Sequence, residues 1–145
     1  QIISKLQYPI VLLGGTEDVE RSNKIAEQST NKNIINTCGS FNINQSASIV
    51  KQANVIITND TGLMHIAAAF NKPIISVWGN TVPEFGMYPY MPDHKSNYII
   101  SEVKGLSCRP CSKLGYQKCP KKHFNCMMEQ DVDLIIKNID NLTNK

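Results

Sequence analysis

The stretch from Val55 to Gly79 constrains the fold of this chain more than any other. Residues 55–58 are apolar and β-branched, as in a buried parallel strand, and residues 73–78 form a second run of the same kind. Between them, residues 63–70 are apolar nearly all round, apart from His65, which predicts a buried helix. The proline that opens the second run cannot continue that helix. The stretch therefore predicts a β-α-β unit.

A polar cluster lies where the first strand of this unit ends. Asp60 is a preferred helix N-cap residue, Gly62 allows close approach to the backbone, and His65 follows Thr61 by one helical turn. The first amides of a helix lack intrahelical partners and attract anions, and ligands of open α/β sheets bind at the carboxyl ends of strands. The cluster indicates a phosphate site. The alternative is that Asp60 only caps the helix and His65 is a satisfied core histidine.

The other elements are expected in an order that continues this alternation. They are a helix tail at 1–7, strands at 9–13, 33–37 and 97–100, and helices at 17–28 and 44–52, the latter capped by Asn44. A final helix is expected at 131–143, capped by Asp131. Its apolar face consists of Val132, Ile135, Ile136, Ile139 and Leu142. This order predicts an α/β fold, a Rossmann-like parallel sheet with helices on both faces. Residues 79–92, rich in Gly, Pro and aromatic residues, are expected to form a loop at the ligand edge.

Composition and charge exclude several classes of protein. The 145 residues are 41% hydrophobic and 19% charged, which is typical of one globular domain. No apolar run approaches the roughly 18 residues of a membrane span. The net charge is +3, and six basic residues crowd one segment: Lys104, Arg109, Lys113, Lys118, Lys121 and Lys122. A solvated basic face is favoured over a site for anionic partners, and nothing indicates specific nucleic-acid readout. Without an initiator methionine or a signal-peptide pattern, the chain reads as a piece of a longer one.

Two further motifs allow more than one interpretation. Cys108, Cys111, Cys119 and Cys126, with His123 between the last two, begin with the Cys-x2-Cys half of a zinc site but lack the usual second half. Reduced thiols or a structural metal are favoured over disulfides. The second motif, Gly14-Gly15-x-Glu17, follows a predicted strand and is explained most simply as a turn.

Residues 59–90, NDTGLMHIAAAFNKPIISVWGNTVPEFGMYPY, resemble the carboxyl-terminal half of the bacterial heptosyltransferase family, glycosyltransferase family nine. The likeness rests on the Asp-Thr-Gly-x-x-His turn, the Ala-Ala-x-x-x-x-Pro that follows, and the Trp-Gly-x-Thr-x-Pro loop. The Gly-Gly-x-Glu motif and the cysteine-rich tail extend it more loosely, so it covers most of the chain.

The resemblance implies a fold and a set of donor-binding residues. Members have the GT-B architecture, and their carboxyl-terminal domain holds an ADP-activated sugar, so the whole chain, 1–145, is expected to be a single nucleotide-sugar-binding domain with an irregular cysteine-rich segment at 105–128. By resemblance, Asp60, Thr61, Gly62 and His65 contact the diphosphate and sugar of ADP-heptose. Glu17 approaches the nucleotide ribose, Gly15 belongs to the same donor-binding set, and Thr81 lines the same cleft.

The resemblance also implies an activity and its partners. The family is inverting, requires no metal, and supplies its catalytic base and acceptor site from an amino-terminal domain that this chain lacks. The parent is therefore expected to be a cytoplasmic glycosyltransferase of lipopolysaccharide synthesis, peripheral at the inner membrane face. Its acceptor is expected to be lipid-linked or an oligosaccharide. This chain is expected to be inactive alone. The alternatives are a non-catalytic interaction module organised by zinc on the four cysteines, with a vestigial sugar site, and an α/β nucleotide-binding protein of different chemistry.

Overall fold

The computed structural model describes residues 1–143, and the side chains of all of these except Lys95. The chain divides into two compact units, Gln1–Ile49 and the part that starts at Val50. Each contains a parallel sheet and helices, so the predicted α/β class is confirmed. The two units are described one at a time. That the whole chain acts as one binding domain stays a prediction.

The first unit builds a two-stranded parallel sheet. Its elements are α1 (Ile2–Lys5), β1 (Ile10–Leu12), the 3-10 turn η1 (Thr16–Asp18), α2 (Val19–Gln28) and β2 (Ile34–Asn36). β1 and β2 pair with Val11 opposite Ile35, and α2 packs against β2. Thr37 extends the pairing, because its hydroxyl and its amide both donate to the carbonyl of Leu12, at 2.7 and 3.0 Å.

Helix α3 (Ile43–Gln52) begins earlier than the sequence suggested. The amide of Gln45 donates to Asn42 Oδ1, and the amide of Asn42 donates to Gln45 Oε1, both at 3.0 Å. This reciprocal pair satisfies two backbone donors at the helix start. The prediction that Asn44 caps the helix is wrong, because Asn44 already lies within its first turn.

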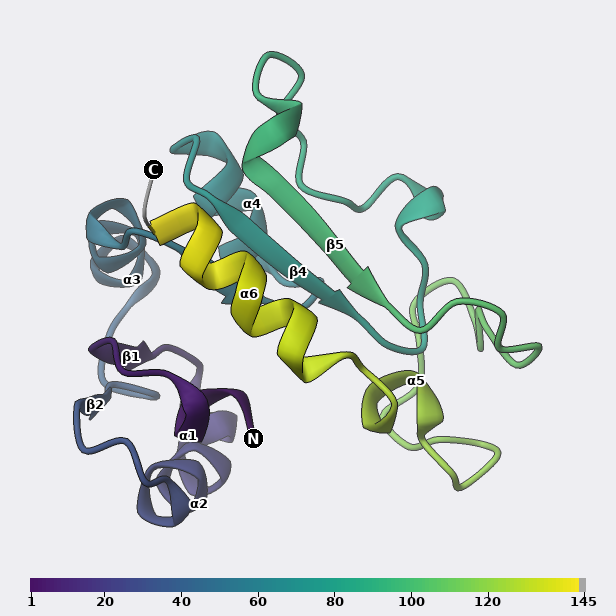
Figure 1. Ribbon diagram of the computed structural model, residues 1–145, viewed down its shortest axis with the longest axis horizontal. Helices are drawn as coiled ribbons and strands as arrows, with labels where there is room; N and C mark the ends of the chain where they lie inside the picture. The colour runs from purple at the N-terminus through teal and green to yellow at the C-terminus, as the bar shows by residue number, and fades with distance from the viewer. Residues whose placement is uncertain (144–145) are drawn as a thin grey trace. The chain divides into compact units, whose positions relative to one another are not determined.

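The second unit holds a parallel sheet with strand order β3-β4-β5 (Ile56–Thr58, Ile74–Trp78 and Tyr98–Glu102). Helix α4 (Gly62–Ala69) packs on β3 and β4, and helix α6 (Val132–Thr143) packs on β4. In Figure 1, α6 crosses in front of β4 and α4 lies behind it. Every residue of β4 is buried, which is the reason for its continuous apolar sequence.

The core of this unit forms around β4. Its side chains come from the strand and from both helices: Met64, Ala67, Ile74, Ile75, Trp78, Ile135 and Ile139. The indole N–H of Trp78 donates to Ser76 Oγ at 3.0 Å, which satisfies two buried polar groups. Elsewhere in this unit, the side chains are less buried than the sequence predicted. Ile57 in β3 is 40% exposed, and α4 buries one face only, since Phe70 at its end is 39% exposed.

The carboxyl-terminal helix agrees with its prediction. The amide of Leu134 donates to Asp131 Oδ1 at 2.9 Å, so Asp131 caps α6, and Ile135, Ile139 and Leu142 are buried. The segment 105–128 is irregular as expected up to Phe124, after which a short helix, α5 (Asn125–Met128), forms. The loop after β4 contains one 3-10 turn, η2 (Pro83–Phe85), and another, η3 (Lys95–Asn97), leads into β5.

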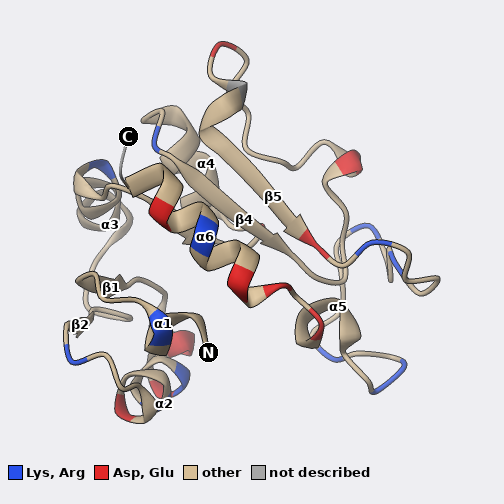
Figure 2. Ribbon diagram, in the orientation of Figure 1, with Lys and Arg blue, Asp and Glu red and all other residues tan. Residues whose placement is uncertain are grey.

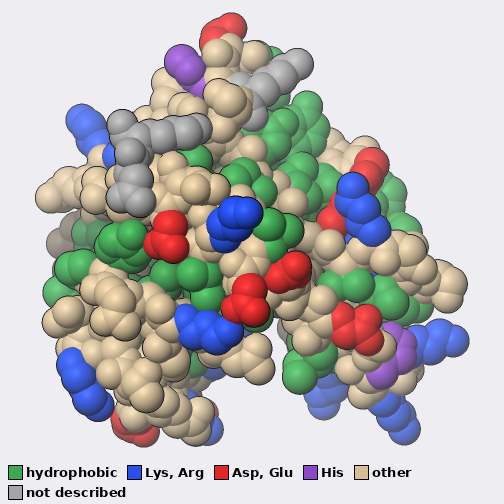
Figure 3. Space-filling view, viewed as in Figure 1, with side chains coloured by type: hydrophobic (Ala, Val, Ile, Leu, Met, Phe, Trp, Pro, Cys, Tyr) green, Lys and Arg blue, Asp and Glu red, His purple; other side chains and the backbone are tan. Residues whose placement is uncertain are grey.

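The surface of the cysteine-rich segment is basic. Lys113, Lys118, Lys121 and Lys122 are exposed, and Figure 2 shows Lys and Arg in the loops that flank α5. In Figure 3, basic side chains and a histidine gather over the same region. These lysines agree with the predicted solvated face. Among the helices of residues 1–143, none has both the length and the apolar character needed to cross a membrane.

Replacing Ile135 with alanine should lower the free energy of unfolding by about 2–5 kcal/mol, the usual cost of removing a buried isoleucine side chain. Ile135 is 1% exposed in α6, whereas Leu134 beside it is 52% exposed. Leu134→Ala is therefore the matched control, expected within about 0.5 kcal/mol of wild type. Urea unfolding of both variants measures the difference, and equal losses would show that α6 does not pack on the sheet as described.

Candidate functional site

The turn between β3 and α4 presents an uncovered helix start. Thr61 takes the N-cap position with an extended backbone (φ −146°, ψ 164°), and its carbonyl accepts the amide of Met64 at 3.0 Å. The amides of Gly62 and Leu63 at the start of the helix have no intrahelical acceptor. Asp60 was predicted to be the cap, which is wrong: it precedes the cap by one residue, because the helix begins at Gly62.

Gly62 leaves the helix start open to a ligand. A Cβ atom built at Gly62 meets no protein atom within 4 Å. Packing within the described chain therefore does not require glycine at this position. The missing side chain leaves the first amides of α4 accessible. Thr61 and His65 are also exposed on this first turn, and Thr61 Oγ1 lies 3.2 Å from Thr58 Oγ1.

Asp60 is electrostatically perturbed. Partial burial raises the pKa of its carboxyl group, and the charge of His65 acts in the opposite direction. The two side chains therefore interact electrostatically across the first turn of α4. A carboxylate at this place can accept a hydrogen bond from a hydroxyl group of a ligand.

Asp60 and Thr81 line the same hollow of about 220 Å³. Asn59 and Asn80 lie on it as well, so its polar lining comes from the β3–α4 turn and from the loop after β4. The structure thus brings together Asp60 and Thr81, two of the residues chosen from the sequence. Thr61, Gly62 and His65 lie at the adjacent helix start and do not line this hollow.

Gly15 and Glu17 belong to the first unit, where they form the turn after β1. The amide of Gly15 donates to Asp18 Oδ2 at 3.1 Å, and the Glu17 carboxylate folds back over Gly15, where a Cβ atom would overlap with it. Both residues are exposed. The turn interpretation of this motif agrees with the structure, and a ligand-binding role of Glu17 stays a prediction.

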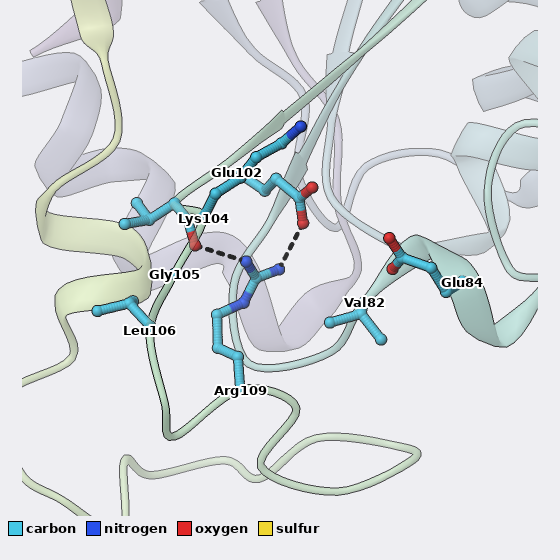
Figure 4. Close-up of a pocket in the computed structure, with 8 residues that line it drawn as sticks. Val82, Glu84, Glu102, Lys104, Gly105, Leu106 and Arg109 are labelled. Atoms are coloured by element: carbon cyan, nitrogen blue, oxygen red, sulfur yellow. Dashed lines mark hydrogen bonds and ion pairs between the residues drawn. The ribbon is translucent and has the colours of Figure 1, made fainter.

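Arg109 is a structural residue that sequence reasoning placed on the solvated basic face. That prediction is wrong for Arg109: its side chain is 6% exposed and pairs with Glu102 at 3.0 Å. It also donates to the carbonyl oxygens of Gly79, Val103 and Thr81 at 2.6, 2.7 and 2.9 Å. Figure 4 shows its guanidinium group turned toward Glu102 at the edge of a second hollow, of about 310 Å³.

The sequence holds one signal for this role of Arg109. Glu102 is the single acidic residue among the six basic residues of that segment, and it lies two residues after the strand predicted at 97–100. The backbone acceptors carry no sequence signal at all.

The four cysteines of the segment affect one another without a formed metal site. Burial first, and then the charges of Cys108 and Cys119, raise the pKa of Cys111, while backbone N–H groups, that of Phe124 foremost, lower the pKa of Cys119. Cys108 Sγ lies 4.0 Å from His123 Nε2. All five cysteines are unpaired, and residues 1–143 contain no group of three His, Cys, Asp or Glu side chains arranged to hold a metal ion.

Comparison with known proteins identifies the family. The model of "Glycosyltransferase family 9 (heptosyltransferase)" matches residues 1–120. Lipooligosaccharide heptosyltransferase 2 of Haemophilus influenzae is 32% identical over 111 residues, which cover 74% of this chain and 32% of that protein. Lipopolysaccharide heptosyltransferase 2 of Escherichia coli is 36% identical over 81 residues, covering 54% and 23%. The chain thus spans about a third or less of the length of these relatives.

Solved structures share the fold. E. coli ADP-heptose LPS heptosyltransferase II superposes with a TM-score of 0.68 at 22% identity, covering 94% of this chain and 36% of that one. The family 9 glycosyl transferase of Veillonella parvula gives a TM-score of 0.71 at 23% identity, covering 98% and 39%. The expected fold class, α/β with parallel sheets as in these glycosyltransferases, is confirmed. That the chain is the carboxyl-terminal half stays a prediction.

The substitution Asp60→Asn should raise the melting temperature at pH 7. Burial raises the pKa of Asp60 in the folded chain, so its ionisation costs stability as the pH rises through that pKa. The gain of the variant should shrink as the pH falls below the folded pKa, where wild-type Asp60 is protonated. Thermal unfolding between about pH 3 and pH 8 measures it, with the exposed Asp93→Asn as control. A pH-independent loss in Asp60→Asn would contradict this account.

Proposed function

Since the chain belongs to glycosyltransferase family 9, we propose that it is the donor-binding part of an enzyme that transfers heptose from ADP-heptose during lipopolysaccharide synthesis. One observation carries the proposal: the helix start at the carboxyl end of β3 is uncovered and lies beside a perturbed carboxyl group, that of Asp60. An anion and a hydroxyl group attached to the same ligand would be bound by these neighbouring features.

The diphosphate occupies the start of α4. The amides of Gly62 and Leu63 and the positive end of the helix dipole attract its charge, and the exposed Thr61 hydroxyl and His65 imidazole add donors. These groups matter most when the sugar leaves, because the diphosphate then gains negative charge. Fixed donors that already point at the place where charge develops stabilise such a transition state.

The sugar occupies the hollow beside the diphosphate. Asp60 and Thr81 line this hollow with Asn59 and Asn80, which together supply hydrogen-bond donors and acceptors for hydroxyl groups. In the first unit, the family resemblance assigns Gly15 and Glu17 to the nucleotide. The exposed carboxylate of Glu17 and the strand-to-helix turn that carries it support this role.

Transfer by the whole enzyme needs more than this chain. The chain spans about a third of the length of these relatives. We propose that the catalytic base and the site for a lipid-linked or oligosaccharide acceptor lie in another part of the enzyme. This chain then binds the donor without turnover. The reaction is inverting, proceeds in the cytoplasm at the inner membrane face, and needs neither a metal nor a nucleic-acid partner.

Gly62→Ala should weaken binding of ADP-heptose by roughly tenfold, about 1.4 kcal/mol, because the new methyl group occupies the space through which the diphosphate approaches the amides. The melting temperature should stay equal or rise slightly, since no protein atom lies within 4 Å of the added Cβ and alanine favours the helix. Calorimetric titration of the 145-residue chain measures the affinity. Ala69→Gly, the reverse exchange at the far end of α4, is the control and should leave affinity unchanged. Unchanged affinity in Gly62→Ala would show that the helix start is not part of the donor site.

The competing interpretation, a zinc-organised module with a vestigial sugar site, is favoured by one contact between possible metal ligands, since Cys108 Sγ and His123 Nε2 lie 4.0 Å apart. We expect nucleotide-sugar affinity and melting temperature to persist after dialysis against a chelator, because helix amides and polar side chains hold the donor without a metal. Metal content is measured before and after dialysis. Stoichiometric zinc, unfolding on its removal and no donor binding in the zinc form would favour the module.

A further inference from the structure

The hollow beside Asp60 has a second lining that the donor-binding motifs do not explain. Besides the polar residues already described, it is lined by Leu114, Tyr116, Phe124 and Met127, all from the cysteine-rich segment. We refer to these four residues as the apolar wall. The hollow is therefore amphipathic, with its polar groups supplied by the turns after β3 and β4 and its apolar groups by one separate segment.

The backbone of the apolar wall is tied to the loop that carries Thr81. Asn80 is the main link: its carbonyl accepts the amide of Cys111 at 2.8 Å, and its Nδ2 donates to the carbonyl of Tyr116 at 2.7 Å. Gly115 adopts φ +79°, and a Cβ atom there would lie 2.5 Å from Asn80 Oδ1. Glycine is thus required at 115 both by its conformation and by the close approach of Asn80.

The other end of the wall is held in the same way. A Cβ atom on Gly79 would lie 2.9 Å from Met127 Sδ, so the loop and α5 are in close contact at this point. Gln130, just after α5, donates from Nε2 to the carbonyls of Trp78 and Cys126 at 3.0 and 2.9 Å. The wall is consequently a fixed part of the hollow.

The side chains of the wall remain uncovered although their backbone is anchored. Leu114 is 85% exposed, Tyr116 53% and Phe124 43%. Large apolar groups that a chain holds in place at a concave site without covering them are typical of binding surfaces. A ligand that fits must offer hydroxyl groups to one side of the hollow and C–H groups to the other.

We propose that the apolar wall contacts the sugar of the activated donor and determines which sugar is accepted, an inference that rests on the proposed function. A pyranose has this divided surface, with hydroxyl groups at its edge and C–H groups on its faces. The hollow lies next to the helix start and not over it, as expected for the group attached to a diphosphate bound there. Tyr116 and Phe124 present rings to the C–H face, and Asp60, Asn80 and Thr81 face the hydroxyl edge.

Titrations of the 145-residue chain with ADP-heptose and with ADP test this proposal. Tyr116→Ala and Phe124→Ala should each weaken ADP-heptose binding at least fivefold and change ADP binding less than twofold. Tyr90→Ala and Phe85→Ala are matched controls, because Tyr90 is 71% exposed, Phe85 is 40% exposed, and neither lines this hollow. Tyr116→Phe should retain wild-type affinity, since the ring makes the contact. Melting temperatures establish that each variant is folded.

The outcomes separate this proposal from the function on which it rests. If wild type binds both ligands and the wall variants lose ADP and ADP-heptose equally, or lose neither, the wall does not contact the sugar. If Tyr116→Phe loses as much as Tyr116→Ala, the tyrosine acts through its hydroxyl group and the apolar contact is refuted. If wild type binds neither ligand, the proposed function fails, and this inference fails with it.

Discussion

The guanidinium group of Arg109 holds the loop after β4, which contributes Gly79 and Thr81 to the candidate site. It donates to three backbone carbonyls, those of Gly79, Thr81 and Val103, and to the carboxylate of Glu102, while almost wholly buried. A buried charge is tolerated when it is paired and its donors are satisfied, and the planar fork of arginine can serve several fixed acceptors at once. Because two of these carbonyls belong to the loop after β4, that loop cannot move without leaving donors of a buried cation unsatisfied.

The topology of the second sheet brings the remaining parts to the same place. In a parallel sheet the strands end at one edge, so the turn after β3, the loop after β4 and the segment after β5 start from neighbouring positions. The uncovered start of α4 and the polar lining of the hollow are two consequences of this single arrangement. Burial of all of β4 makes the arrangement rigid, because the middle strand is packed from both sides by α4 and α6.

Much of the fold could be predicted from the sequence because it depends on local patterns. The apolar run of β4, the break at Pro73 and the cap at Asp131 act within a few residues and leave a clear signal. The prediction failed for Asn44 and Asp60, because a second polar residue nearby, Asn42 or Thr61, can take the same cap and the choice depends on where the helix starts. Glu102 was the single sequence signal for the buried role of Arg109, because the other partners of Arg109 are backbone carbonyls. The apolar wall left no signal, since it depends on a hollow formed by segments distant in the sequence.

Asn80 belongs to both linings of the hollow at once. Its side chain faces the polar lining and also holds the carbonyl of Tyr116 in the apolar wall. The two linings therefore cannot diverge independently during evolution: an exchange at position 80 that altered a polar contact would also release the backbone of the wall. Selection on the polar contacts of position 80 would therefore act at the same time on the anchoring of the apolar wall.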